Sequence, residues 1–243
     1  MEHKGATDGA TMEDQVRRLR RALAMRDVDD QATDPMPVER SKKDRAALVI
    51  ERSLKLWAAN IVEPHKSGTP ANGAEQIDWL IRDPDCANWH WLDKYTHNGQ
   101  TAWCGFAQSY AFRAAGLQWR IVEKVLPSCY RLKKWAKENG RFVPVDEMKP
   151  GDIVLVDSTG DGKANHITLC WADSESPDPE EYTAAYEASD RDYYDHPGYI
   201  TLEGNAKGLL PDGRQVEGYV ARTRPLDQVT HVIRFLEEDY GDE

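Results

Sequence analysis

Hydrophobic residues recur at helical spacing in the first part of the chain and at strand spacing in the last part. Apolar positions three and four residues apart predict four main helices, over residues 41–63, 74–82, 104–115 and 129–139. From residue 150 onward, short apolar runs bounded by turn residues predict five strands, over residues 152–156, 166–171, 199–203, 216–223 and 229–236. Helices followed by strands with hairpin-length turns favour an α+β fold, in which N-terminal helices pack on an antiparallel sheet of about five strands.

The two ends of the chain stand apart from this pattern. Residues 1–40 combine a short basic helix with an Asp/Pro-rich linker, which predicts a flexible tail. Residues 41–236 form the expected domain, and residues 237–243 form an acidic tail. A second acidic segment, residues 173–197, interrupts the strands and is expected to be solvated surface.

Charge and composition exclude several classes of function. The 243-residue chain has a net charge of -11, which argues against nucleic acid as a partner because phosphate binding depends on clustered Lys and Arg. No apolar stretch approaches 18 residues and the first residues lack an apolar signal sequence, so we expect no membrane span and synthesis in the cytoplasm. The four cysteines form no CxxC pair, and nothing in their spacing requires an oxidising compartment or predicts an oligomeric state.

Chemistry is predicted where polar residues stand at the ends of these elements. Cys104 opens a predicted helix, and the partial positive charge of a helix start lowers a thiol pKa. His166 opens a strand, and Glu203 and Asn205 follow at the end of the next. These positions can converge at one edge of the sheet as a nucleophile, a base and an orienting group.

The residues around these positions resemble the CHAP domain, a family of cysteine peptidases and amidases related to NlpC/P60 and papain-like enzymes. The resemblance covers about residues 83–236 and rests on five pieces in the family order: Trp103-Cys104-Gly105-Phe106, Ser128-Cys129, Pro150-Gly151-Asp152, Asn165-His166-Ile167-Thr168 and Leu202-Glu203-Gly204-Asn205. It implies Cys104 as nucleophile, His166 as base, and Glu203 or Asn205 as the group that orients the imidazole. Glu203 is the first choice because a carboxylate stabilises an imidazolium better than an amide does.

The resemblance also implies a substrate. It indicates an endolysin-like, antibacterial hydrolase of peptidoglycan amide bonds, an amidase or an endopeptidase, which acts at the cell wall after lysis, virion delivery or non-classical secretion. The aromatic residues before the cysteine are expected to contact this substrate: Trp91, Tyr95 and Trp103. Two alternatives stay open, a papain-like hydrolase or acyltransferase acting on a non-wall amide, and a non-catalytic CHAP-like binding module.

No cofactor is expected, and the sequence offers one weaker alternative. Asp157, Thr159 and Asp161 stand at the first, third and fifth positions of a possible calcium loop, with a glycine at the sixth. The glutamate expected at the twelfth position is absent, so an ordinary Asp/Gly turn is the preferred interpretation.

Overall fold

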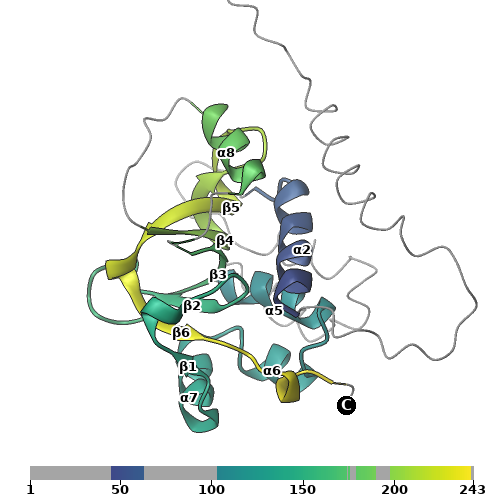
Figure 1. Ribbon diagram of the computed structural model, residues 1–243, viewed down its shortest axis with the longest axis vertical. Helices are drawn as coiled ribbons and strands as arrows, with labels where there is room; N and C mark the ends of the chain where they lie inside the picture. The colour runs from purple at the N-terminus through teal and green to yellow at the C-terminus, as the bar shows by residue number, and fades with distance from the viewer. Residues whose placement is uncertain (1–44, 63–102, 174, 176–178, 190–197, 242–243) are drawn as a thin grey trace, which may run out of the picture. The chain divides into compact units, whose positions relative to one another are not determined.

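The computed structural model describes residues 45–62, 103–173, 175, 179–189 and 198–241, which all belong to one unit, residues 43–243. Within these residues the fold is α+β, with five α-helices and one antiparallel sheet of six strands (Figure 1). The predicted tail, residues 1–40, and the helix predicted over residues 74–82 lie outside the described residues.

Three predicted helices are present, and the first of them ends at residue 58, before its predicted end at residue 63. Helix α2, Arg45–Ala58, buries Val49, Leu56 and Trp57 along one face. Helix α5, Cys104–Ala114, is buried along its first nine residues and is followed by a glycine with a φ of +90°. Helix α7, Cys129–Asn139, begins after the N-cap Ser128, whose hydroxyl accepts the N–H of Arg131, and ends at the left-handed Gly140.

The structure contains two further helices that the sequence did not predict. Helix α6, Trp119–Lys124, is six residues long, too short for a helical period to show in the sequence. Helix α8, Glu180–Glu187, lies in the acidic segment that was expected to be solvated. This expectation is wrong for α8, because Tyr182 and Ala185 are buried and Tyr182 contacts the ring of Trp171.

The sheet has the strand order β1-β6-β2-β3-β4-β5. Its strands are β1, Phe142–Val143; β2, Ile153–Val156; β3, His166–Ala172; β4, Gly198–Leu209; β5, Gln215–Pro225; and β6, Val229–Ile233. The predicted β2–β3 hairpin is confirmed, with Val156 opposite His166. The two-residue β1 and three short 3₁₀ turns, Val145–Glu147, Leu226–Gln228 and Glu237–Asp239, complete the described elements.

The end of one predicted strand is wrong. Strand β4 continues past Glu203 to Leu209, although a turn was expected after Glu203-Gly204-Asn205. The chain instead makes an irregularity in the β4–β5 pairing between Glu203 and Ala206, where Asn205 has a φ of +58°. A bulge of this kind adds residues without ending the strand, so local turn residues misled the prediction.

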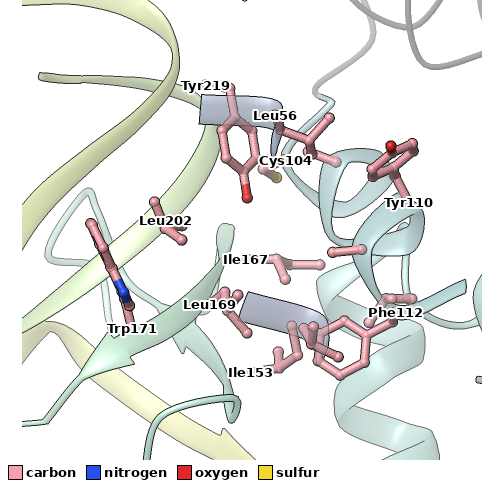
Figure 2. Close-up of a cluster of buried hydrophobic side chains, with 14 of the residues drawn as sticks. Leu56, Cys104, Tyr110, Phe112, Ile153, Ile167, Leu169, Trp171, Leu202 and Tyr219 are labelled. Atoms are coloured by element: carbon pink, nitrogen blue, oxygen red, sulfur yellow. The ribbon is translucent and has the colours of Figure 1, made fainter. Parts of the chain in front are cut away.

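The main core lies between the helices and one face of the sheet. Figure 2 shows Tyr110 and Phe112 of α5 and Leu56 of α2 near Ile153, Ile167, Leu169 and Leu202 of the strands. A smaller cluster, made of Met148, Val154, Val156, Cys170, Tyr199 and Val232, covers the other face. Helix α5 contacts α2, β3 and β4, so its first residue is held against both strands that carry the predicted site.

The predicted acidic tail is partly packed. Asp239 and Tyr240 are buried, and Arg141 donates to both carboxylate oxygens of Asp239, with the shorter contact at 2.7 Å. The residues up to Tyr240 are therefore part of the fold and not a solvated tail. Among the described residues, no helix has the length and apolar character that crossing a membrane requires.

Candidate active site

Cys104 is the first residue of α5, and a glycine behind it allows another segment to approach closely. A Cβ atom at Gly105 would lie 2.7 Å from the Cα of Pro127, so only glycine fits beneath this loop. The loop joins α6 to α7 and brings the N-terminus of α7 beside that of α5. The Cys104 side chain is 6 % exposed and His166 is 7 % exposed, so both reach the edge of the core.

The imidazole of His166 connects the thiol to a buried carboxylate. His166 Nε2 lies 2.9 Å from Glu203 Oε2, and the imidazole lies close enough to the Cys104 thiol to lower the pKa of that thiol. Because Glu203 occupies Nε2, the ring nitrogen left for the sulfur is Nδ1. The imidazole therefore lies between the thiol and the carboxylate, the order that a nucleophile, a base and an orienting group require.

Glu203 is held in turn by a buried arginine. Arg224 Nε donates to Glu203 Oε1 and Arg224 Nη2 donates to Glu203 Oε2, both at 2.6 Å, and the Arg224 side chain is buried. The hydroxyl of Thr201 also donates to Glu203 Oε1, and Arg224 Nη1 donates to Gln228. A bidentate guanidinium fixes both the position and the plane of a carboxylate.

The register of two strands explains how these groups meet. Tyr199 and Arg224 are paired across β4 and β5, and Thr201 and Glu203 follow Tyr199 at alternating positions of β4. Alternate residues of a strand share a face, so Thr201, Glu203 and Arg224 lie on the face opposite α5. His166, at the start of β3, bridges from this face to the thiol.

The pKa values of Cys104, His166 and Glu203 all depart from their ordinary values because the three groups interact. Burial by itself raises the pKa of Cys104, but the charge and hydrogen bond of His166 and the N–H groups of Ile167 and Gly105 bring it below its ordinary value. Burial by itself lowers the pKa of His166, and the Cys104 thiolate together with Glu203 raises it to about 9. Burial opposes ionisation of Glu203 as well, yet its bonds to His166 and Arg224 hold its pKa well below the usual range.

The other two described cysteines shift in the opposite direction. Burial raises the pKa of Cys129 to about 12, with a smaller contribution from the charge of Cys104. Burial also raises the pKa of Cys170, and all three described thiols are free. Of these three, only Cys104 has the environment of a reactive thiolate.

Side-chain packing fixes the distance between α5 and β4. Gln108, one turn after the cysteine, is buried and donates from Nε2 to the carbonyl of Leu202 at 3.0 Å. A Cβ atom at Gly204 would lie 2.6 Å from the ring of Trp103 and 2.8 Å from the Cβ of Ala107. Gly204 therefore lets the start of α5 lie directly on the strand that carries Glu203.

The predicted site residues have different outcomes. Cys104, His166 and Glu203 are brought together, and the group on the imidazole is Glu203 and not Asn205, which lies in the bulge of β4. Trp103, which was expected to contact substrate, is fully buried, and its ring lies against Gly204. Trp91 and Tyr95 lie outside the described residues.

The three calcium candidates lie in a turn whose backbone N–H groups donate hydrogen bonds to the carboxylate of Asp157. Asp157 accepts hydrogen bonds from the backbone N–H groups of Thr159, Gly160 and Gly162, and Thr159 also bonds to Asn165. Asp161 accepts the N–H of Lys163. In the part of the chain that the structure describes, no group of three or more His, Cys, Asp or Glu side chains is placed to hold a metal ion.

Arg224 and Thr201 are the members of the site that the sequence did not reveal. In the sequence, the two residues stand as an arginine and a threonine inside apolar strands. This pattern fits a solvated strand face equally well and does not predict a buried site. Pairing of β4 with β5 was needed to bring Arg224 to Glu203.

Comparison with models of known protein families gives no match, and comparisons with curated proteins and with solved structures give none either.

Proposed function

We propose that this protein is a cysteine-dependent hydrolase of the CHAP type that cleaves amide bonds in peptidoglycan through a thioester intermediate. The observation that carries the proposal is the position of the His166 imidazole between the Cys104 thiol, at the N-terminus of a buried helix, and the Glu203 carboxylate. The residue motifs that resemble the CHAP domain supply the substrate class.

Each group has one role in the proposed reaction. Nδ1 of His166 takes the proton from the Cys104 sulfur, and the thiolate attacks the carbonyl carbon of the scissile amide. The imidazolium then donates that proton to the leaving amine nitrogen as the C–N bond breaks, which leaves a thioester on Cys104. His166 next removes a proton from water as the oxygen attacks the thioester carbon. The C–S bond breaks to release the carboxylic acid product, and the imidazolium returns its proton to the sulfur of Cys104.

Two features of the fold support the charged states in these steps. The backbone N–H groups at the start of α5 are the donors we assign to the oxyanion of the tetrahedral intermediate. Glu203 holds Nε2–H of His166, which directs Nδ1 to the sulfur and stabilises the imidazolium.

The test is hydrolysis of purified peptidoglycan by the full chain and two variants. Cys104→Ala and His166→Ala are each expected to abolish release of muropeptides, because each removes one partner of the thiolate–imidazolium pair. Both melting temperatures should stay within a few degrees of the parent, since Glu203 keeps its pairing with Arg224 in each variant. Mass spectrometry of the products distinguishes an amidase from an endopeptidase, and hydrolysis retained by either variant contradicts the mechanism.

The same chemistry on a non-wall amide is the second candidate. The chain has a net charge of -11, which favours a basic substrate over an anionic wall polymer if charge is averaged over the molecule. Cleavage of a basic peptide together with inactivity on peptidoglycan would support this candidate over the first.

A further inference from the structure

The positive charge of this acidic protein is concentrated in one described segment. Residues 119–141, which contain α6 and α7, hold seven Lys and Arg residues and two Glu residues, in a chain where acidic residues outnumber basic ones by 42 to 31. Figure 1 shows α6 and α7 at the bottom of the view, with the acidic helix α8 at the top. The mean charge of the molecule therefore does not describe this end of it.

Four of the exposed residues of α7 form a continuous line along the helix. We call Tyr130, Lys133, Lys134 and Lys137 the α7 stripe, because their spacing of three, four and seven residues places them on one face. All four are exposed, and Tyr130 is 76 % exposed, the largest value among the exposed large hydrophobic side chains of the described residues. The opposite face of the helix buries Leu132 and Ala136, so the stripe faces away from the core.

The ion pair that involves the α7 stripe is too weak to neutralise its positive charge. Lys134 lies 3.8 Å from Glu138, in a pair whose two side chains are both more than half exposed. Such exposed pairs are strongly screened by water and contribute little. The charge of Lys133 contributes to lowering the pKa of His231 on β6, after the larger effect of burial, which shows that this lysine is close enough to the sheet to act on it.

The N-terminal end of the stripe lies beside the candidate active site. The α6–α7 loop passes directly over Gly105, and Cys129, the first residue of α7, is close enough to Cys104 for the thiolate charge to raise its pKa. The stripe begins at the next residue, Tyr130, and extends for about 10 Å along the helix axis. A polymer lying on the stripe would therefore lead toward the thiol.

We propose that the α7 stripe is a docking surface for the anionic glycan–peptide strand of peptidoglycan, and this proposal rests on the proposed function. Peptidoglycan presents the two kinds of group that the stripe matches. Its carboxylates complement the three lysines, and its sugar rings offer flat C–H faces that pack on an exposed aromatic ring such as Tyr130. The docked strand would place its stem-peptide amide bonds at Cys104 and would be attracted in spite of the net negative charge of the protein.

The experiment measures binding without catalysis. Full-length Cys104→Ala protein is sedimented with purified peptidoglycan sacculi at low salt and at 0.15 M and 0.5 M salt, with or without the triple change Lys133→Glu, Lys134→Glu and Lys137→Glu. We expect the triple change to weaken binding about tenfold or more at low salt, and the difference to shrink as salt screens the charges. Tyr130→Ala is expected to weaken binding about threefold at every salt concentration, because ring packing is not screened, and Tyr130→Phe should retain most of the affinity.

The matched control carries the same change in net charge elsewhere. Lys55→Glu, Lys149→Glu and Lys207→Glu alter three exposed lysines outside residues 119–141, and binding should fall less than twofold. An equal loss in the control, or no binding of the parent protein to sacculi, overturns the proposal. A larger effect of the triple change on duplex DNA or on anionic vesicles than on sacculi also overturns it, in favour of that other partner.

Two readouts keep the result interpretable. Melting temperatures establish that each variant is folded, and the Lys→Gln triple replaces the charge-reversed one if the latter does not fold. Since binding is read in a Cys104→Ala background, loss of docking and loss of hydrolysis are separate results. Docking without hydrolysis by the parent chain would refute the proposed function and leave the surface assignment standing.

Discussion

At the scale of single residues, the unusual feature of the site is that its orienting carboxylate is already paired. Glu203 accepts two hydrogen bonds from Arg224 and one from Thr201 in addition to the contact with His166. The Glu203–Arg224 pair is neutral as a whole, so the thiolate–imidazolium pair forms beside a dipole and not beside a net negative charge. A buried carboxylate without this partner would be costly to keep ionised.

Thiol reactivity should separate Cys104 from the other described cysteines. At pH 6 we expect iodoacetamide to modify Cys104 at least tenfold faster than Cys129 or Cys170, because the pKa of Cys104 is lowered while burial raises those of the other two. Peptide mapping by mass spectrometry gives the rate at each site. His166→Ala should slow the modification of Cys104, and equal rates at the three thiols would indicate a non-catalytic protein.

The pH dependence of hydrolysis should report the imidazole. In the proposed reaction the leaving amine takes a proton from His166, whose pKa is raised to about 9, so activity is expected to fall as the pH rises through about 9. Glu203→Gln removes one of the charges that raise this pKa. The alkaline limb should therefore move to lower pH, and kcat/KM should fall about 100-fold.

The control for this variant is Glu187→Gln, the same change at an exposed position of α8, which should leave the profile unchanged. Glu203→Gln also leaves Arg224 buried without its counter-charge, a change that typically costs about 3–5 kcal/mol. Its unfolding curve must therefore show a folded protein at the assay temperature. An unshifted alkaline limb in a folded variant would separate Glu203 from the titration of His166.

At the scale of elements, the site depends on how closely α5 lies on β4. The first turn of α5 contributes the thiol and β4 contributes the carboxylate, while the bond from Gln108 to Leu202 and the absence of a side chain at Gly204 hold the two together. Neither element alone contains a site. The hairpin of β2 and β3 then presents His166 between them.

Gly204→Ala should disturb this contact more than its small size suggests. The new Cβ would lie 2.6 Å from the Trp103 ring, so α5 must move away from β4, and overpacking of this kind costs about 1–3 kcal/mol. We expect a lower free energy of unfolding and a slower reaction of Cys104 with iodoacetamide. Lys207→Ala, an exposed position of the same strand, is the control and should change neither. Unchanged thiol reactivity in Gly204→Ala would show that the site tolerates a shift of the helix.

At the scale of residues 45–241, the C-terminal residues form hydrogen bonds with the segment after α5 and lie close to the start of α2. Gly241 N–H donates to the carbonyl of Gly116 at the end of α5, and the carbonyl of Asp239 accepts the N–H of Gln118. The guanidinium of Arg45, at the start of α2, lies 5.0 Å from the Tyr240 ring centre. Residues near both ends of the segment 45–241 thus contact each other and the helix that carries Cys104.

Asp239→Ala should therefore destabilise the protein, although it lies in a stretch that reads as an acidic tail. Losing its bonds to Arg141 is expected to lower the free energy of unfolding by about 1–3 kcal/mol, measured by chemical denaturation. Glu238→Ala removes only the exposed partner of the same arginine and should cost less than about 1 kcal/mol. Equal effects of the two changes would mean that the buried pair adds nothing to stability.

The sequence by itself predicted the class of fold, several element bounds and the three residues, Cys104, His166 and Glu203, that the structure brings together. Hydrophobic periodicity and capping residues act locally, which is why α7 could be predicted from Ser128 to Gly140 and the β2–β3 hairpin from its Asp/Gly turn. The candidate nucleophile and base could be predicted because both stand at element ends, where side chains can meet.

Only the tertiary structure decided what surrounds those residues. Four features depend on segments that are distant in sequence. They are the burial of Arg224, the pairing of His166 with Glu203 and not Asn205, the continuation of β4 through its bulge, and the packing of Trp103 on Gly204. No local pattern distinguishes a charged side chain that meets a buried partner from one that meets water. Which of the two a side chain meets is decided by the register of β4 with β5 and by the packing of α5 on the sheet. Both exist only once the sheet has formed.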